Sequence, residues 1–139
     1  MIEHTPLSGY CLCKAVRVFI PPAAHHVSAC HCDMCRRWGG GPLLSIESGR
    51  GVVIEGEENV TVYRSSDWAE RGFCKHCGSH LFYRTHDQGF YALPAGLFDK
   101  ADHLNFALQV FIDQKPPYYS FADETKTMTR AEVIALFKQ

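Results

Sequence analysis

The sequence Cys30-His31-Cys32-Asp33-Met34-Cys35 places three cysteines within six residues. Two further groups, Cys11-Leu12-Cys13 and Cys74-Lys75-His76-Cys77, hold the other four of the seven cysteines, so that no cysteine is isolated. Buried cysteines often serve as small apolar side chains, but that role does not require three tight clusters. The clustering therefore indicates metal binding.

The spacing within each cluster constrains the backbone. Residues i and i+2 of an extended strand lie about 6.5 Å apart. Two sulfurs on one tetrahedral zinc lie roughly 3.8 Å apart, because the Zn–S bond is near 2.3 Å. Each Cys-x-Cys unit is therefore expected on a bend, whereas the two residues between Cys74 and Cys77 suit a zinc knuckle.

The number of cysteines suggests how they divide between metal ions. Structural zinc takes four protein ligands, whereas catalytic zinc commonly takes three and keeps one position open. We assign the two outer pairs to a structural site and the central triplet to an open site: Cys11, Cys13, Cys74 and Cys77, and Cys30, Cys32 and Cys35. Spacing alone also allows the first two clusters to share a metal, and it allows a redox-active triplet.

Length and composition bound the remaining possibilities. The 139 residues, 46% of them hydrophobic and 12% aromatic, predict a single domain over residues 1–139. A net charge of −1 gives no sign of a nucleic-acid or anionic membrane surface. The first residues lack a signal-peptide pattern, and no apolar run reaches the roughly 20 residues of a membrane span. We expect a cytoplasmic protein whose cysteines are thiols or metal ligands.

Short β-branched segments separated by turn residues predict a mainly β fold. Ser48-Gly49-Arg50-Gly51 is interpreted as a hairpin turn between two of the strands. The segment 104–112 alternates weakly, which predicts burial on both faces. Thr129 and Glu132 form a capping-box pattern before a helix over 131–137. Strands are expected over 15–20, 42–47, 52–55, 60–64, 80–84, 90–93 and 104–112.

Charged residues and histidines lie beside the cysteines. Arg36 and Arg37 follow the triplet directly and are candidates for binding a substrate carboxylate. Lys14 and Lys75 are interpreted as surface charge. His31 lies between two proposed ligands, but its place between residues i and i+2 predicts a side chain that points away from the metal.

Three motifs resemble the glutathione-dependent formaldehyde-activating enzyme (Gfa) family, whose fold is an Mss4-like zinc β-sandwich. They are Gly9-Tyr10-Cys11-Leu12-Cys13-Lys14-Ala15-Val16-Arg17, Cys30-His31-Cys32-Asp33-Met34-Cys35-Arg36 and Phe73-Cys74-Lys75-His76-Cys77-Gly78-Ser79. The similarity runs from about residue 9 to 119. The chain departs from the family at Gln109 and Tyr118, where members often carry a histidine and a tryptophan.

The resemblance implies short antiparallel strands with a short C-terminal helix, and two Zn²⁺ ions partitioned as the cysteine count suggests. It also implies a carbon–sulfur lyase similar to S-(hydroxymethyl)glutathione synthase, acting on a thiol such as glutathione and an aldehyde such as formaldehyde. Nucleic-acid and membrane partners are not expected, and a homodimer is left open. The alternative is a non-enzymatic Mss4-like scaffold or interaction module. A methionine sulfoxide reductase ranks last, because no cysteine follows Cys77 to act as its nucleophile.

Overall fold

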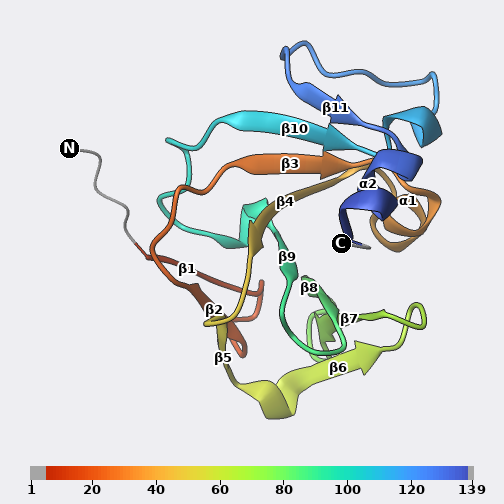
Figure 1. Cartoon of the computed structure of the whole chain (residues 1–139). Coiled ribbons are helices and arrows are strands. Elements are labelled where there is room, and N and C mark those ends of the chain that lie inside the picture. The colour runs from red at the N-terminus through yellow and green to blue at the C-terminus, as the bar shows by residue number, and fades with distance from the viewer. Residues whose placement is uncertain (1–5, 138–139) are drawn as a thin grey trace. The chain divides into compact units, whose positions relative to one another are not determined.

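The computed structural model describes residues 6–137 and is mainly β (Figure 1). Its chain divides into two compact units, unit 1 within residues 6–25 and 46–103 and unit 2 within 26–45 and 104–137. Among these residues lie eleven strands in two sheets, and neither sheet closes into a barrel. The mainly β prediction is confirmed, and the single-domain interpretation stays a prediction. None of the described helices is long and apolar enough to cross a membrane.

Unit 1 contains a three-stranded antiparallel sheet and a four-stranded antiparallel run. The first has the order β1-β2-β5, and the second joins β6, β7, β8 and β9 in sequence. The strands are β1 (Leu7–Tyr10), β2 (Arg17–Ile20), β5 (Val53–Glu55), β6 (Val60–Tyr63), β7 (Ala69–Cys74), β8 (His80–Thr85) and β9 (Tyr91–Pro94). Short 3₁₀ turns occupy Glu57–Asn59 and Ala95–Leu97.

The core of unit 1 is built from buried apolar side chains. Val18 and Ile20 alternate along β2 and are fully buried, as is Val16 just before the strand. The consecutive residues Leu81 and Phe82 of β8 are fully buried as well. Glycines permit two close approaches. A Cβ on Gly72 would lie 2.3 Å from the Phe82 ring, and one on Gly9 would lie 2.1 Å from the Leu97 carbonyl oxygen. Close packing, rather than chain bending, therefore requires glycine at both positions.

Unit 2 contains strands β3 (Val27–Cys30), β10 (Phe106–Val110) and β11 (Lys126–Met128). It also holds helices α1 (Asp33–Gly39) and α2 (Arg130–Phe137) and a 3₁₀ turn at Ile112–Gln114. Strand β10 pairs in parallel with both β3 and β11 (Figure 1). The expected antiparallel pairing is confirmed in unit 1, and the two pairings of β10 are parallel. Strand β4 (Leu43–Ser48) carries the chain from unit 2 into unit 1.

Two local expectations are wrong and one is confirmed. The turn at 48–51 makes no hairpin, because β5 pairs with β2 and β4 belongs to the other sheet. In β10 only Gln109 is buried, so the strand is not buried on both faces. The capping box is present, since Thr129 N donates to Glu132 Oε1 at 2.9 Å and Glu132 N to Thr129 Oγ1 at 3.3 Å.

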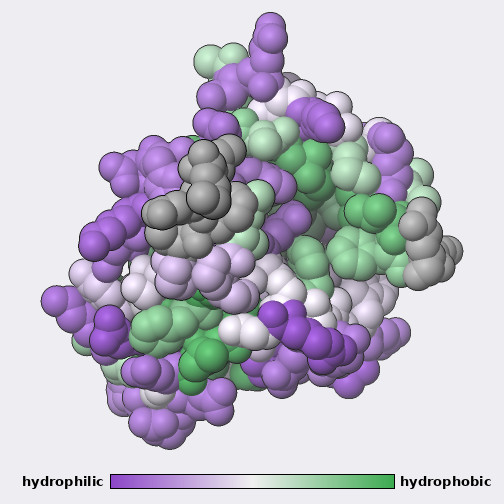
Figure 2. Space-filling model, turned by 60° about the vertical axis from the view of Figure 1, so that its left-hand side comes forward, coloured by the Kyte–Doolittle hydropathy of each residue, from purple (hydrophilic) through white to green (hydrophobic). Residues whose placement is uncertain are grey.

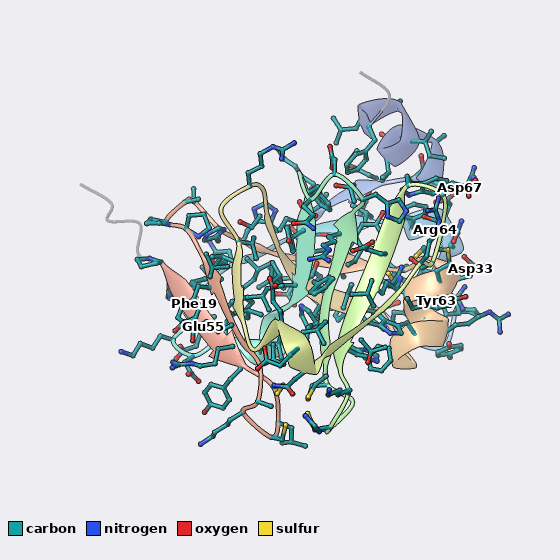
Figure 3. The ribbon with its side chains drawn as sticks, turned by 90° about the horizontal axis from the view of Figure 1, so that it is seen from below. Phe19, Asp33, Glu55, Tyr63, Arg64 and Asp67 are labelled. Atoms are coloured by element: carbon teal, nitrogen blue, oxygen red, sulfur yellow. The ribbon has the colours of Figure 1, made fainter. Side chains whose placement is uncertain are left out.

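The surface mixes polar and apolar side chains. On the face shown in Figure 2, apolar groups emerge in more than one place with polar groups between them. In unit 1 the largest exposed apolar side chains include Leu12, Tyr63 and Trp68. Beyond β6, Arg64 Nη2 donates to the Asp67 carbonyl oxygen at 3.3 Å, and the two residues lie near Tyr63 in Figure 3.

Candidate metal centres

The outer two cysteine pairs come together in unit 1. The Sγ atoms of Cys11, Cys13, Cys74 and Cys77 all lie within 4.8 Å of one another. The Cys11–Cys13 and Cys13–Cys74 sulfur separations are both 3.7 Å, close to the roughly 3.8 Å of two thiolates on one zinc. We call these four residues the four-thiol cluster. Cys11 and Cys74 are fully buried and Cys13 is exposed.

A tight turn brings Cys11 and Cys13 together, as the spacing predicted. Lys14 N donates to the Cys11 carbonyl oxygen at 2.9 Å, and Lys14 takes a left-handed φ of 66°. Cys11 N donates to the Val16 carbonyl oxygen at 3.0 Å, which closes the loop. The chain therefore reverses direction after β1 and leads into β2.

Cys74 ends β7 and Cys77 follows on a knuckle closed by Gly78. The Gly78 amide donates to the Cys74 carbonyl oxygen at 2.8 Å, and its φ of 77° favours glycine. Ser79 links this knuckle to the first turn: the Leu12 amide donates to Ser79 Oγ at 3.0 Å, and Ser79 Oγ lies 3.2 Å from Cys77 Sγ. The Ser79 hydroxyl accepts from Leu12 and can donate its own hydrogen to the Cys77 sulfur.

The pKa values of two thiols in the cluster shift in opposite directions. Hydrogen bonds from the Ser79 hydroxyl and amide lower the pKa of Cys77 to about 5. At Cys13 a backbone bond from Ala15 lowers the pKa, but burial and the neighbouring thiols raise it, to about 12 in balance. Four thiolates this close repel one another unless a cation lies between them. Soft sulfur donors at tetrahedral separations fit Zn²⁺.

The triplet Cys30, Cys32 and Cys35 gathers in unit 2, with all three Sγ atoms within 4.8 Å. Cys30 ends β3, and Cys32 caps α1 by accepting from the Cys35 amide at 3.3 Å. The bend between Cys30 and Cys32 is thus the passage from strand to helix, beside the labelled Asp33 in Figure 3. Hydrogen bonds to Cys32 and Cys35, together with burial, raise the pKa of Cys30.

The residues around the triplet are held in different ways. Arg36 is half-buried and its Nε donates to the His31 carbonyl oxygen at 3.0 Å, whereas Arg37 is exposed. Contact of either arginine with a substrate stays a prediction. Beside the four-thiol cluster, Lys14 and Lys75 are exposed, as expected for surface charge.

His31 is fully buried, and its ring nitrogens are not grouped with the three sulfurs of the triplet. That its side chain points away from a bound metal stays a prediction. Its Nδ1 lies 2.7 Å from the Tyr119 hydroxyl and its Nε2 lies 2.8 Å from Gln109 Oε1. Burial lowers the pKa of His31, and the Lys115 and Arg36 charges lower it further against the opposing effect of the Gln109 bond. Sequence reasoning missed these partners, because they lie 78 and 88 residues further along the chain.

Known proteins resemble this chain in sequence and in fold. Residues 6–114 match the profile of the family described as glutathione-dependent formaldehyde-activating enzyme. An uncharacterized lyase of Schizosaccharomyces pombe is 38% identical over 127 residues, covering 91% of this chain and 93% of that protein. The crystal structure of a Rhodobacter sphaeroides protein shares the fold, with a TM-score of 0.57 and 21% identity over 72% of this chain and 99% of that one. The chain therefore belongs to the glutathione-dependent formaldehyde-activating enzyme family.

Proposed function

We propose that this protein is a zinc-dependent carbon–sulfur lyase that joins a thiol such as glutathione to formaldehyde or a related aldehyde, and reverses that addition. Family membership and the lyase name of the Schizosaccharomyces pombe relative support the reaction class. The observation that carries the proposal is the triplet, which offers three thiol ligands from one short segment and no fourth cysteine. Three protein ligands leave a position for substrate.

Each cysteine cluster receives one role in this proposal. Cys11, Cys13, Cys74 and Cys77 would hold a structural Zn²⁺, whereas Cys30, Cys32 and Cys35 would hold a catalytic one. When bound at the triplet, zinc would supply positive charge that favours the thiolate form of an incoming thiol at neutral pH. Three cysteine thiolates already weaken its Lewis acidity, which favours thiol chemistry over water activation.

The reaction itself balances without a further reagent. The sulfur of the thiol forms a bond to the aldehyde carbon, the carbonyl π bond breaks, and the thiol proton ends on the oxygen. The product is a hydroxymethyl thioether, and the reverse reaction returns the thiol and the aldehyde. Arg36 and Arg37, next to the triplet, would bind a carboxylate of the thiol substrate.

The proposed compartment, partners and domain organisation are those expected from the sequence. A reducing compartment such as the cytoplasm would keep seven thiols available for metal. Small-molecule thiols and aldehydes are the proposed partners, and the whole chain would act as one domain. A non-enzymatic zinc scaffold is the alternative, and it predicts a single metal ion at the four-thiol cluster.

Product formation tests the proposal directly. Wild-type protein and a Cys32→Ala variant are mixed with glutathione and formaldehyde, and the exchange between free thiol and adduct is followed by NMR. The wild type should accelerate the exchange above the uncatalysed rate and Cys32→Ala should not. A His76→Ala variant, changed at an exposed residue of the other cluster, should retain the wild-type rate. Equal, uncatalysed rates for wild type and Cys32→Ala would overturn the proposal.

A further inference from the structure

We infer that His31 is a positioning residue for the triplet, and that a segment beyond the family-matched residues holds it in place. The inference rests on the proposed function, since it assigns a role at the same site. Cys30 and Cys32 flank His31 directly, so any change in the backbone torsion angles of His31 alters the direction of one thiol relative to the other. The structure fixes His31 at four points, two on its ring and two on its backbone.

The hydrogen bonds of the ring have a consistent direction. Gln109 Nε2 donates to Thr125 Oγ1 at 3.0 Å, which leaves Gln109 Oε1 to accept from His31 Nε2. His31 Nδ1 then accepts from the Tyr119 hydroxyl. Both ring nitrogens are thereby satisfied in the neutral form, and burial makes it costly to break either bond.

The backbone of His31 is held as firmly as its ring. His31 N donates to the Val110 carbonyl oxygen at 3.1 Å, which extends the pairing of β3 with β10. Its carbonyl oxygen accepts from Arg36 Nε at 3.0 Å, one turn into α1. Because the hydrogen bonds hold both the ring and the backbone of His31, they fix the bend that joins Cys30 to Cys32.

The outer support comes from the segment 119–125. The Tyr119 ring stacks on His31 with centroids 5.5 Å apart, and Phe121 lies 6.0 Å from the same ring. Phe121 in turn packs against Phe106 of β10 at 4.9 Å. Tyr119, Phe121 and Thr125 all lie after residue 114, where the family match ends. Residues outside the matched region therefore complete the support of the triplet.

The other cluster supplies an internal contrast. His76 also lies between two cysteines of a proposed site, but it is exposed, and its Nε2 lies 2.8 Å from Asn59 Oδ1. A residue merely adjacent to ligands should affect metal binding little. A buried residue with both ring nitrogens engaged should affect it more, because it fixes the backbone that joins two proposed ligands.

Cobalt binding tests the inference. Metal-free full-length protein is titrated with Co²⁺, and the thiolate-to-cobalt absorption bands report the binding of each equivalent. We expect the first equivalent at the four-thiol cluster and the second at the triplet. Tyr119→Phe removes one hydroxyl and keeps the stacked ring. Gln109→Met removes both hydrogen bonds of the side-chain amide at similar side-chain volume. Each variant should weaken the second equivalent by about 10-fold or more and leave the first unchanged. His76→Ala should leave the second equivalent unchanged.

The outcomes separate this inference from the proposed function. Wild-type affinity for the second equivalent in both Tyr119→Phe and Gln109→Met would overturn the positioning role, even if the enzyme is active. Equal weakening of both equivalents would also overturn it, because that result indicates a general loss of structure. Selective weakening in the two variants, together with a wild type that does not accelerate the joining of glutathione to formaldehyde, would support the positioning role and overturn the proposed function.

Discussion

The four-thiol cluster and the triplet are built from the same side chain in different ways. The cluster joins segments far apart in the sequence, since Cys13 and Cys74 are separated by 61 positions, and it contains two fully buried thiols. The triplet draws its three thiols from six consecutive residues at a passage from strand to helix. Closing a long loop restricts the unfolded chain more than closing a short one. From this comparison we expect the four-thiol cluster to stabilise the fold, and we expect the fold to survive loss of the triplet.

The largest expected effect is loss of the four-thiol cluster. Cys74→Ser should lower the free energy of unfolding by about 4 kcal/mol or more, because it removes a buried thiol from the proposed structural metal site. Cys32→Ser, at a half-buried position of the triplet, should cost no more than about 1 kcal/mol. Urea unfolding followed by circular dichroism measures both. Equal destabilisation by the two substitutions would contradict the comparison.

A smaller effect is expected at the strand that leads into the four-thiol cluster. Gly9→Ala would place a Cβ 2.1 Å from the Leu97 carbonyl oxygen, so the backbones of both segments must shift. The expected loss is about 1–3 kcal/mol, measured by thermal unfolding. Gly41→Ala, after α1 in unit 2, is the matched control, because a Cβ there meets no atom within 4 Å. A stable Gly9→Ala variant would show that the approach of β1 to Leu97 is not required.

The next effect concerns metal affinity rather than folding. Ser79→Ala removes the hydroxyl that accepts from Leu12 and donates to Cys77, so the four-thiol cluster should bind zinc about 10-fold more weakly. Competition with a chromophoric chelator measures this affinity. Ser79→Thr keeps the hydroxyl and should restore most of it. An alanine variant that binds zinc as tightly as the wild type would refute the linking role of Ser79.

The smallest expected effect is loss of the ion pairs that Glu70 forms in unit 1. Glu70 on β7 bonds to Arg84 Nη2 at 2.7 Å and to His86 Nδ1 at 3.1 Å. Partial burial raises the pKa of Glu70, but these partners lower it more, so the pKa lies below its ordinary value. The stabilisation is therefore present above the unfolded-state pKa and is lost as the pH falls through the folded-state pKa.

Glu70→Gln should consequently cost about 1 kcal/mol at neutral pH, and the difference from wild type should vanish in acid. Unfolding curves of both proteins at matched pH values measure that difference, because acid loss of metal affects the two alike. A Glu70→Gln penalty that stays constant down to pH about 3 would argue against the ion pair as its cause.

Local signals in the sequence predicted local features well. The turn at Cys11–Cys13 and the capping box at Thr129 appear as expected, because each depends on residues close together in the chain. The pairing of β5 with β2 was missed, since a turn pattern at 48–51 reports a reversal but not the partner strand. Helix α1 was missed as well, because its seven residues are too few for a clear apolar period.

The candidate sites show the same difference between features that were predicted from the sequence and features that were not. The grouping of the seven cysteines followed from spacing and number, and the structure brings together the same two sets. The support of the triplet did not follow, because Gln109 and Tyr119 become neighbours of His31 only through the packing of β10 and the segment after it. Such contacts depend on tertiary structure, and no motif in one sequence encodes them.

The zinc content of purified protein, measured together with its unfolding temperature, tests the central claim most directly. The account predicts two zinc ions per wild-type chain, and one in Cys32→Ala with an unfolding temperature close to that of the wild type. It also predicts that Cys74→Ala loses the structural ion and unfolds at a clearly lower temperature. One zinc per wild-type chain, or equal unfolding of the two variants, would contradict the division into a structural cluster and a working triplet.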